Sequence, residues 1–159
     1  MSSKKETAGL VLFLFFMTIA GITIAGDTYN YKASCPQNGG KKVEDIWKFY
    51  QCECTSYAAD KMNEHGVKFN NYYKGSHWGY ADNWIIAAKK AGVPYDKNPK
   101  HRDIAWFSIG HVAYVEDVDS KGNIKVSDYN HDLKHDYAFR TINKGSTNYP
   151  TVFIHFGAK

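Results

Sequence analysis

Hydrophobic and polar residues follow two different periods along the chain, one in each half. The first half has apolar residues three or four positions apart, which is typical of helices. This spacing predicts helices over residues 42–50, from about Cys54 to a stop at Gly66, and over residues 80–92. In the second half the period is two, as in half-buried strands. Four strands are predicted, over residues 103–109, 110–118, 123–130 and 151–156.

Helices that precede a set of antiparallel strands predict an α+β domain with segregated layers, and 159 residues suit one such domain. At the N-terminus, Lys4 and Lys5 precede an apolar run from Ala8 to Ile24. Residues 1–26 are therefore predicted to be a secretory signal peptide, with an uncleaved membrane anchor as the alternative. We expect the rest of the chain to be secreted or periplasmic, without stable membrane contact once the leader is cleaved.

Three cysteines in an exported chain leave one thiol unpaired. Cys52 and Cys54 are too close in sequence to pair without strain, so Cys35 pairs with one of them. Cys54 is expected at the start of the second helix, where unpaired N–H groups and the helix dipole favour a thiolate nucleophile. We therefore assign Cys35 and Cys52 to a disulfide and Cys54 to the free thiol. The alternative is that Cys54 is only a small buried residue.

A cysteine nucleophile needs a histidine base, and His111 is the strongest candidate among the seven histidines. It opens a predicted strand directly after Gly110, a residue that leaves space for a ligand backbone. The turn "DSKG" is expected to pair Val118 with Asn123 in the next strand. Glu116 is five residues from His111 along its strand and is therefore expected on the opposite face of the sheet.

The same register selects a partner for His111. It places His111 opposite Asn130 and diagonal to Asp128, so that an amide and an acid lie within reach of one imidazole. The prediction depends on this register, because a shift of one residue would place Tyr129 and His131 beside His111 instead.

Three stretches of the sequence resemble the CHAP domain, the cysteine-, histidine-dependent amidohydrolase/peptidase family. "FYQCECTSYAADKM" resembles the segment of the family that holds the nucleophile, "DIAWFSIGHVAYVEDV" its histidine strand and "VSDYN" the strand that follows. The resemblance extends over about residues 44–156. It implies a papain-like fold, with N-terminal helices packed on a C-terminal antiparallel β-sheet. The catalytic domain would cover residues 44–159, after a loop over residues 27–43 that holds a disulfide cysteine.

The resemblance also implies roles for four residues. Cys54 would be the nucleophile, His111 the base, Asp128 the group that orients His111, and Asn130 a supporting polar group. The family usually has Glu where Asp128 stands, so the shorter side chain has to lie closer or share its role with Asn130. The implied reaction is hydrolysis of peptidoglycan amide bonds through a thioester. Both an N-acetylmuramoyl-L-alanine amidase and a peptide endopeptidase fit this chemistry.

No cofactor or metal is expected. Some family members bind calcium through an acidic cluster ahead of the cysteine, but only Glu44, Asp45 and Glu53 stand there. The stretch "DYNHDLKHD" gathers acids and histidines and is the alternative metal site. "DVDSKGN" lacks the bidentate acid of a calcium loop and is better explained as a hairpin turn.

The expected partner is peptidoglycan. Trp78, in a loop, and Tyr57 are the aromatic residues expected to bind it, whereas Trp84 and Trp106 lie within predicted elements, where such residues are more often core. A net charge of +4 does not indicate nucleic-acid binding. A cognate inhibitor protein is conceivable as a second partner, since a small exported wall hydrolase can harm its producer. The rival functions are a non-catalytic cell-wall-binding module and a papain-like enzyme that acts on a protein substrate.

Overall fold

The computed structural model describes residues 26–157. The predicted signal peptide lies outside this part of the chain, except for Gly26. Within the described residues, none of the helices has the length and apolar character needed to cross a bilayer.

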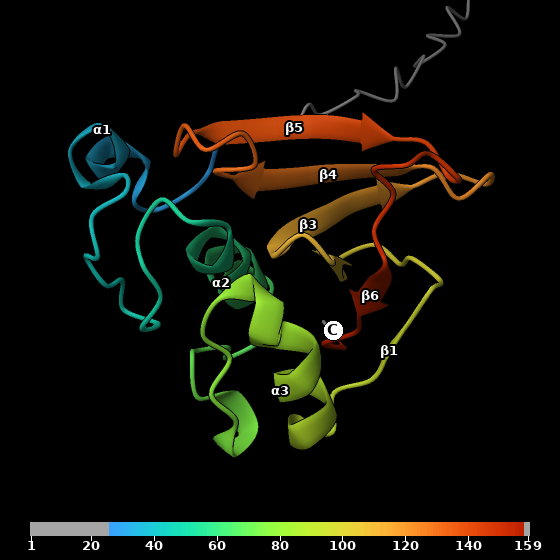
Figure 1. The fold of residues 1–159 in the computed structure, drawn as a ribbon, viewed down its shortest axis with the longest axis horizontal. Helices are drawn as coiled ribbons and strands as arrows, with labels where there is room; N and C mark the ends of the chain where they lie inside the picture. The colour runs from blue at the N-terminus through green and yellow to red at the C-terminus, as the bar shows by residue number, and fades with distance from the viewer. Residues whose placement is uncertain (1–25, 158–159) are drawn as a thin grey trace, which may run out of the picture.

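The described chain has the predicted α+β architecture, with its longer helices on one side of a six-stranded antiparallel sheet. Strand order across the sheet is β1-β6-β2-β3-β4-β5. Figure 1 shows α2 below β3 and β4, with α3 beneath it. The helical elements are η1 (Lys32–Ser34), α1 (Cys35–Asn38), α2 (Cys54–Glu64), η2 (Tyr73–Gly75), η3 (Ala81–Asn83) and α3 (Trp84–Ala91). The strands are β1 (Tyr95–Asp96), β2 (Ile104–Phe107), β3 (His111–Val118), β4 (Ile124–Tyr129), β5 (Tyr137–Ile142) and β6 (Val152–Ile154).

Two of the three predicted helices are present, α2 and α3. α2 contacts β3 and β4 and buries Tyr57, Ala58 and Met62 in the core between helix and sheet. α3 ends where Gly92 adopts a left-handed backbone with φ 64°, which glycine allows without steric cost. The apolar spacing of both segments therefore does mark the faces that are buried.

The predicted helix over residues 42–50 is wrong. This segment forms a tight loop, because one oxygen of the Asp45 side chain accepts hydrogen bonds from the backbone N–H groups of Trp47 at 2.8 Å and Phe49 at 2.9 Å. Lys48 turns the chain with φ 71°. An aspartate that bonds nearby backbone groups offers them an alternative to a helix, and here that alternative prevails.

The hairpin of β3 and β4 differs from the expected register at its turn and agrees with it near His111. At the turn, Val118 lies opposite Ile124 rather than the predicted Asn123. A β-bulge at Glu116 then shifts the pairing by one residue, so that Tyr114 lies opposite Ser127. The bulge compensates for the longer turn and restores the predicted register at the end of the hairpin that holds His111.

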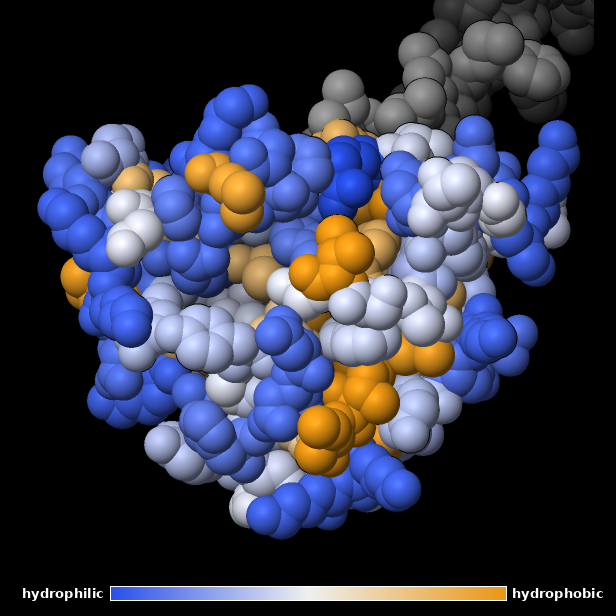
Figure 2. All heavy atoms as spheres, in the orientation of Figure 1, coloured by the Kyte–Doolittle hydropathy of each residue, from blue (hydrophilic) through white to orange (hydrophobic). Residues whose placement is uncertain are grey.

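Each face of the sheet carries a hydrophobic cluster. One face packs against α2 and α3, and the other buries a smaller cluster that includes Ala113, Val126 and Phe153. Figure 2 shows that the face viewed in Figure 1 is mostly hydrophilic, with separate hydrophobic patches, one of them over α3. This face therefore presents no continuous apolar surface.

Candidate active site

Cys54 is the first residue of α2 and is the free cysteine. Cys35 and Cys52 form the predicted disulfide, with 5.4 Å between their Cα atoms. Cys52 has φ 66°, so the chain turns sharply just before the helix. The disulfide ties this turn to α1 and thereby fixes the start of α2.

His111 and Asp128 meet at the end of the β3–β4 hairpin. The Nε2 atom of His111 lies 3.1 Å from Oδ2 of Asp128. The Asp128 side chain has no exposed surface, and the His111 side chain is 12% exposed. The Cys54 thiol is a second hydrogen-bonding partner of the imidazole. One imidazole therefore joins the thiol to a buried carboxylate.

The ionisation of His111 reflects these two partners. Burial by itself would lower the pKa of this histidine, but the hydrogen bonds to Asp128 and Cys54, together with the charges of both groups, raise the pKa to about 9. The site therefore favours an imidazolium, the form that stabilises a neighbouring thiolate and can donate a proton.

Arg140 is a site residue that the sequence analysis missed. It lies on β5, and its guanidinium Nη2 donates to Oδ2 of Asp128. The Arg140 side chain is 24% exposed. His131, the residue that a shifted register would have brought to the site, lies at the margin, with Nδ1 4.0 Å from Oδ1 of Asp128. Asp128 thus interacts with three cationic or potentially cationic groups.

Asn130 lies beyond the end of β4, in a left-handed conformation with φ 58°. Its side-chain amide donates to Glu53 Oε2 at 2.7 Å, and its oxygen accepts the backbone N–H of His135 at 3.0 Å. These contacts tie the end of the hairpin to the residue that precedes Cys54, rather than to His111.

Glu116 lies on the other face of the sheet, as expected. Its carboxylate accepts a hydrogen bond from Ser127 at 2.6 Å, and Ser127 in turn accepts one from the Tyr57 hydroxyl at 2.9 Å. Tyr57 belongs to α2, so this chain of hydrogen bonds joins the helix to the sheet, away from Asp128.

The structure does not support Trp78 and Tyr57 as substrate-binding residues. Trp78 is 0% exposed and Tyr57 is 1% exposed, so neither side chain can touch a substrate in this structure. Trp78 instead packs among Phe69 and Trp84, and its indole N–H donates to the Tyr73 carbonyl at 3.1 Å. A tryptophan in a loop segment is here part of the core because its ring packs against Trp84, the first residue of α3.

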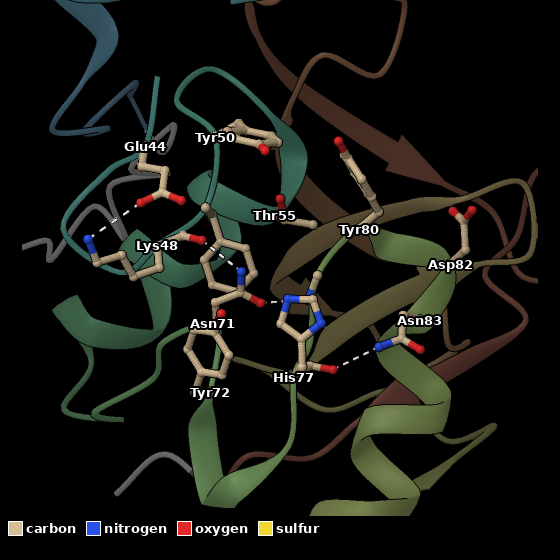
Figure 3. Close-up of a pocket in the computed structure, with 12 residues that line it drawn as sticks. Glu44, Lys48, Tyr50, Thr55, Asn71, Tyr72, His77, Tyr80, Asp82 and Asn83 are labelled. Carbon is tan, nitrogen blue, oxygen red and sulfur yellow. Dashed lines mark hydrogen bonds and ion pairs between the residues drawn. The ribbon is translucent and has the colours of Figure 1, made fainter. Parts of the chain in front are cut away.

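A groove of about 490 Å³ lies at the start of α2 (Figure 3). Thr55, the residue after Cys54, lines this groove. A second hollow, of about 150 Å³, is lined by His111 and Arg140. The other lining residues of the groove include Tyr50, Tyr72, His77, Tyr80 and Asp82. Tyr72 and Tyr80 are both 62% exposed, so the groove presents exposed aromatic rings, although not those of Trp78 and Tyr57.

The acids and histidines of "DYNHDLKHD" do not gather into a metal site. Among residues 26–157, no three His, Cys, Asp or Glu side chains are arranged to hold a metal ion. His135 lies with Nδ1 3.2 Å from Glu53 Oε1, and Lys134 pairs with Asp132.

Comparison with known proteins gives consistent results. The family model of the CHAP domain matches residues 44–130. A probable autolysin LDP from Staphylococcus aureus is 41% identical over 117 residues, which cover 70% of this chain and 40% of the autolysin. The staphylococcal secretory antigen ssaA2 from the same species is 40% identical over 82 residues, covering 50% of this chain and 28% of the antigen.

Among solved structures, the crystal structure of an N-acetylmuramoyl-L-alanine amidase from Staphylococcus aureus superposes with a TM-score of 0.57 at 26% sequence identity. The match covers 72% of this chain and 33% of the amidase chain. The chain thus spans less than half the length of each of these relatives. The family model covers more than half of the chain, and so the chain belongs to the CHAP domain family.

Proposed function

We propose that this protein hydrolyses amide bonds of peptidoglycan, with Cys54 as the nucleophile, His111 as the acid–base group and Asp128 as the group that orients His111. The observation that carries the proposal is the single imidazole that joins the free thiol to a fully buried carboxylate. The names of the relatives, an autolysin and an amidase, support peptidoglycan as the substrate.

The reaction has two halves. In the first, the Cys54 thiolate attacks the carbonyl carbon of the substrate, and the C–S bond forms as the carbonyl becomes an oxyanion. His111 gives its proton to the leaving amine, the C–N bond breaks, and a thioester remains. In the second half, His111 takes a proton from water, the resulting hydroxide attacks the thioester, and the C–S bond breaks to release the acid and the thiolate.

The start of α2 supplies electrostatic stabilisation for both tetrahedral intermediates. The first N–H groups of a helix have no acceptor within the helix and lie at the positive end of its dipole. Because Cys54 is the first helical residue, an oxyanion that forms on its substrate lies close to these donors. They would therefore contribute to an oxyanion hole.

The proposed site of action is outside the cytoplasm. The disulfide between Cys35 and Cys52 supports this assignment, because structural disulfides persist in oxidising compartments and are rare in the cytosol. The similarity to a protein named a secretory antigen also supports a site of action outside the cytoplasm.

The decisive experiment is mass spectrometry of soluble fragments that the purified protein releases from peptidoglycan. Wild type is compared with Cys54→Ala and His111→Gln. His101→Gln serves as the matched control, because His101 is exposed and, among residues 26–157, its ring bonds only the backbone carbonyl of Glu116. We expect fragments from wild type and His101→Gln and none from the other two. New termini at the lactyl group identify an amidase, and termini within the peptide identify an endopeptidase. Binding of wild type without any release would replace this proposal by a non-catalytic wall-binding module.

A further inference from the structure

Asp82 is a carboxylate without a partner in the groove beside Cys54. It lies in η3 and is exposed. In the part of the chain that the structure describes, it forms no hydrogen bond or ion pair, and it lines the groove. Its Oδ1 lies against Gly110, where any side chain would collide with it. Gly110 is the residue before His111, so this free negative charge lies next to the proposed catalytic histidine.

The other charges of the groove cancel each other. Glu44 and Lys48 form an ion pair, with 3.4 Å between Nζ and Oε2 (Figure 3). Among the acidic residues, lysines and arginines of the lining, Asp82 therefore leaves one formal negative charge without a counter-charge. A single carboxylate provides too few ligands for a divalent cation, but it is sufficient to bind one organic ammonium group.

Aromatic rings complete the surroundings of Asp82. Tyr50 and Tyr80 both line the groove, with their ring centroids 6.1 Å apart. Tyr80 is 62% exposed and stands two residues before Asp82. Figure 3 shows Tyr80 between Thr55 and Asp82. The face of a tyrosine ring attracts cations and packs against methylene groups, so this part of the groove suits an alkylammonium chain.

We propose that Asp82 selects substrates with a free primary ammonium group near the bond that is cut. The inference rests on the proposed function, since it assigns the substrate class of the same site. The ammonium group would form an ion pair with Asp82, and its carbon chain would pack against Tyr80. It belongs either to a diamino-acid side chain or to a peptide N-terminus. Asp82 is a specificity residue and takes no part in the proton transfers.

The test compares untreated peptidoglycan with peptidoglycan whose amines have been acetylated by acetic anhydride, which removes their positive charge. For wild type we expect kcat/KM to fall about tenfold on acetylation, mainly through a higher KM. Asp82→Asn has the same shape without the charge. It should cleave both preparations at the reduced rate that wild type shows on acetylated peptidoglycan. Asp117→Asn is the matched control, because Asp117 is 57% exposed and pairs with Lys125 in the β3–β4 hairpin, and it should discriminate as wild type does.

Two additions keep the inference separate from the proposed function. Binding of Cys54→Ala to the two preparations shows without turnover whether acetylation weakens the interaction. If wild type cleaves neither preparation, the proposed function is overturned, and this binding measurement still decides the role of Asp82. Partial acetylation followed by mass spectrometry of cut and uncut peptides shows whether the side-chain or the terminal amine has to be free. The inference would be overturned if wild type cleaved the two preparations equally and Cys54→Ala bound them equally. It would also be overturned if Asp82→Asn still preferred untreated over acetylated peptidoglycan as strongly as wild type does.

Discussion

The Nε2 atom of His111 lies 3.1 Å from Oδ2 of Asp128, and the Asp128 side chain is completely removed from solvent. The second hydrogen-bonding partner of the His111 ring is Cys54. A carboxylate can only accept, so this contact holds the ring in place and fits the neutral tautomer with the proton on Nε2, as the proposed role of Asp128 as third member of a catalytic triad requires.

Replacement of Asp128 by Asn should reduce kcat about 10²- to 10⁴-fold, because the isosteric amide keeps the packing but loses the charge that supports the imidazolium. The pKa of His111 should fall from its value of about 9 for the same reason. Rates of peptidoglycan cleavage and an NMR titration of the His111 ring measure the two effects. An unchanged kcat in Asp128→Asn, with the His111 pKa also unchanged, would remove Asp128 from the site.

Stability should depend on the protonation of His111. Its pKa is raised in the folded state to about 9, above the usual value near 6.5 that applies to the unfolded chain. The folded protein thus binds this proton more tightly. The resulting stabilisation is complete below about pH 6.5 and is lost as the pH rises to about 9. The Tm of wild type should therefore decline over this range more than that of His111→Gln, and parallel declines of the two proteins would contradict the assignment.

The places of the proposed catalytic residues in the fold could be predicted because local signals determine them. Gly66 and the apolar spacing define α2, which fixes Cys54 at its start. The period of two and one short turn define the hairpin that brings His111 to Asp128. That prediction was correct near His111 even though the turn itself is one residue longer, because the bulge at Glu116 compensates. A bulge of this kind leaves no clear mark in the sequence.

The features that the sequence did not predict depend on individual side-chain contacts. Arg140 was missed because β5 alternates poorly, with five of its six residues partly or fully exposed, so that the strand lacks the usual pattern. Trp78 was assigned to a groove because it follows a stretch of polar loop residues, yet it fills the core beside Trp84. The segment around Asp45 has helical spacing, but its carboxylate bonds the backbone locally. In each case the deciding contact is invisible to a periodicity argument.

Arg140 should contribute both to stability and to catalysis. Its replacement by Gln leaves the buried Asp128 carboxylate without its guanidinium partner, and loss of one member of a buried ion pair typically costs about 3 kcal/mol. Because the Arg140 side chain is 24% exposed, solvent screening should reduce the loss to about 1–2 kcal/mol. Urea denaturation measures this loss.

A structural role alone would leave the pH profile of kcat/KM unchanged. Without Arg140, Asp128 should support the His111 imidazolium more strongly, so the alkaline limb of the profile should move to higher pH. Arg140→Lys retains the charge and should restore part of the stability. A profile identical to that of wild type in Arg140→Gln would limit Arg140 to a structural role.

Loss of the disulfide should destabilise the start of α2. Cys35 and Cys52 are 17 residues apart, and a crosslink that closes a loop of this size contributes about 3 kcal/mol by restricting the unfolded chain. The double replacement Cys35→Ser with Cys52→Ser should therefore lower the free energy of unfolding by about this amount, as measured by urea denaturation in the background of Cys54→Ser. Cys54→Ser alone is the matched control, since it removes a thiol and leaves the disulfide. Dithiothreitol should destabilise this control and leave the protein without cysteines unaffected. Equal stability of the two proteins in the absence of reductant would show that the disulfide does not stabilise this turn.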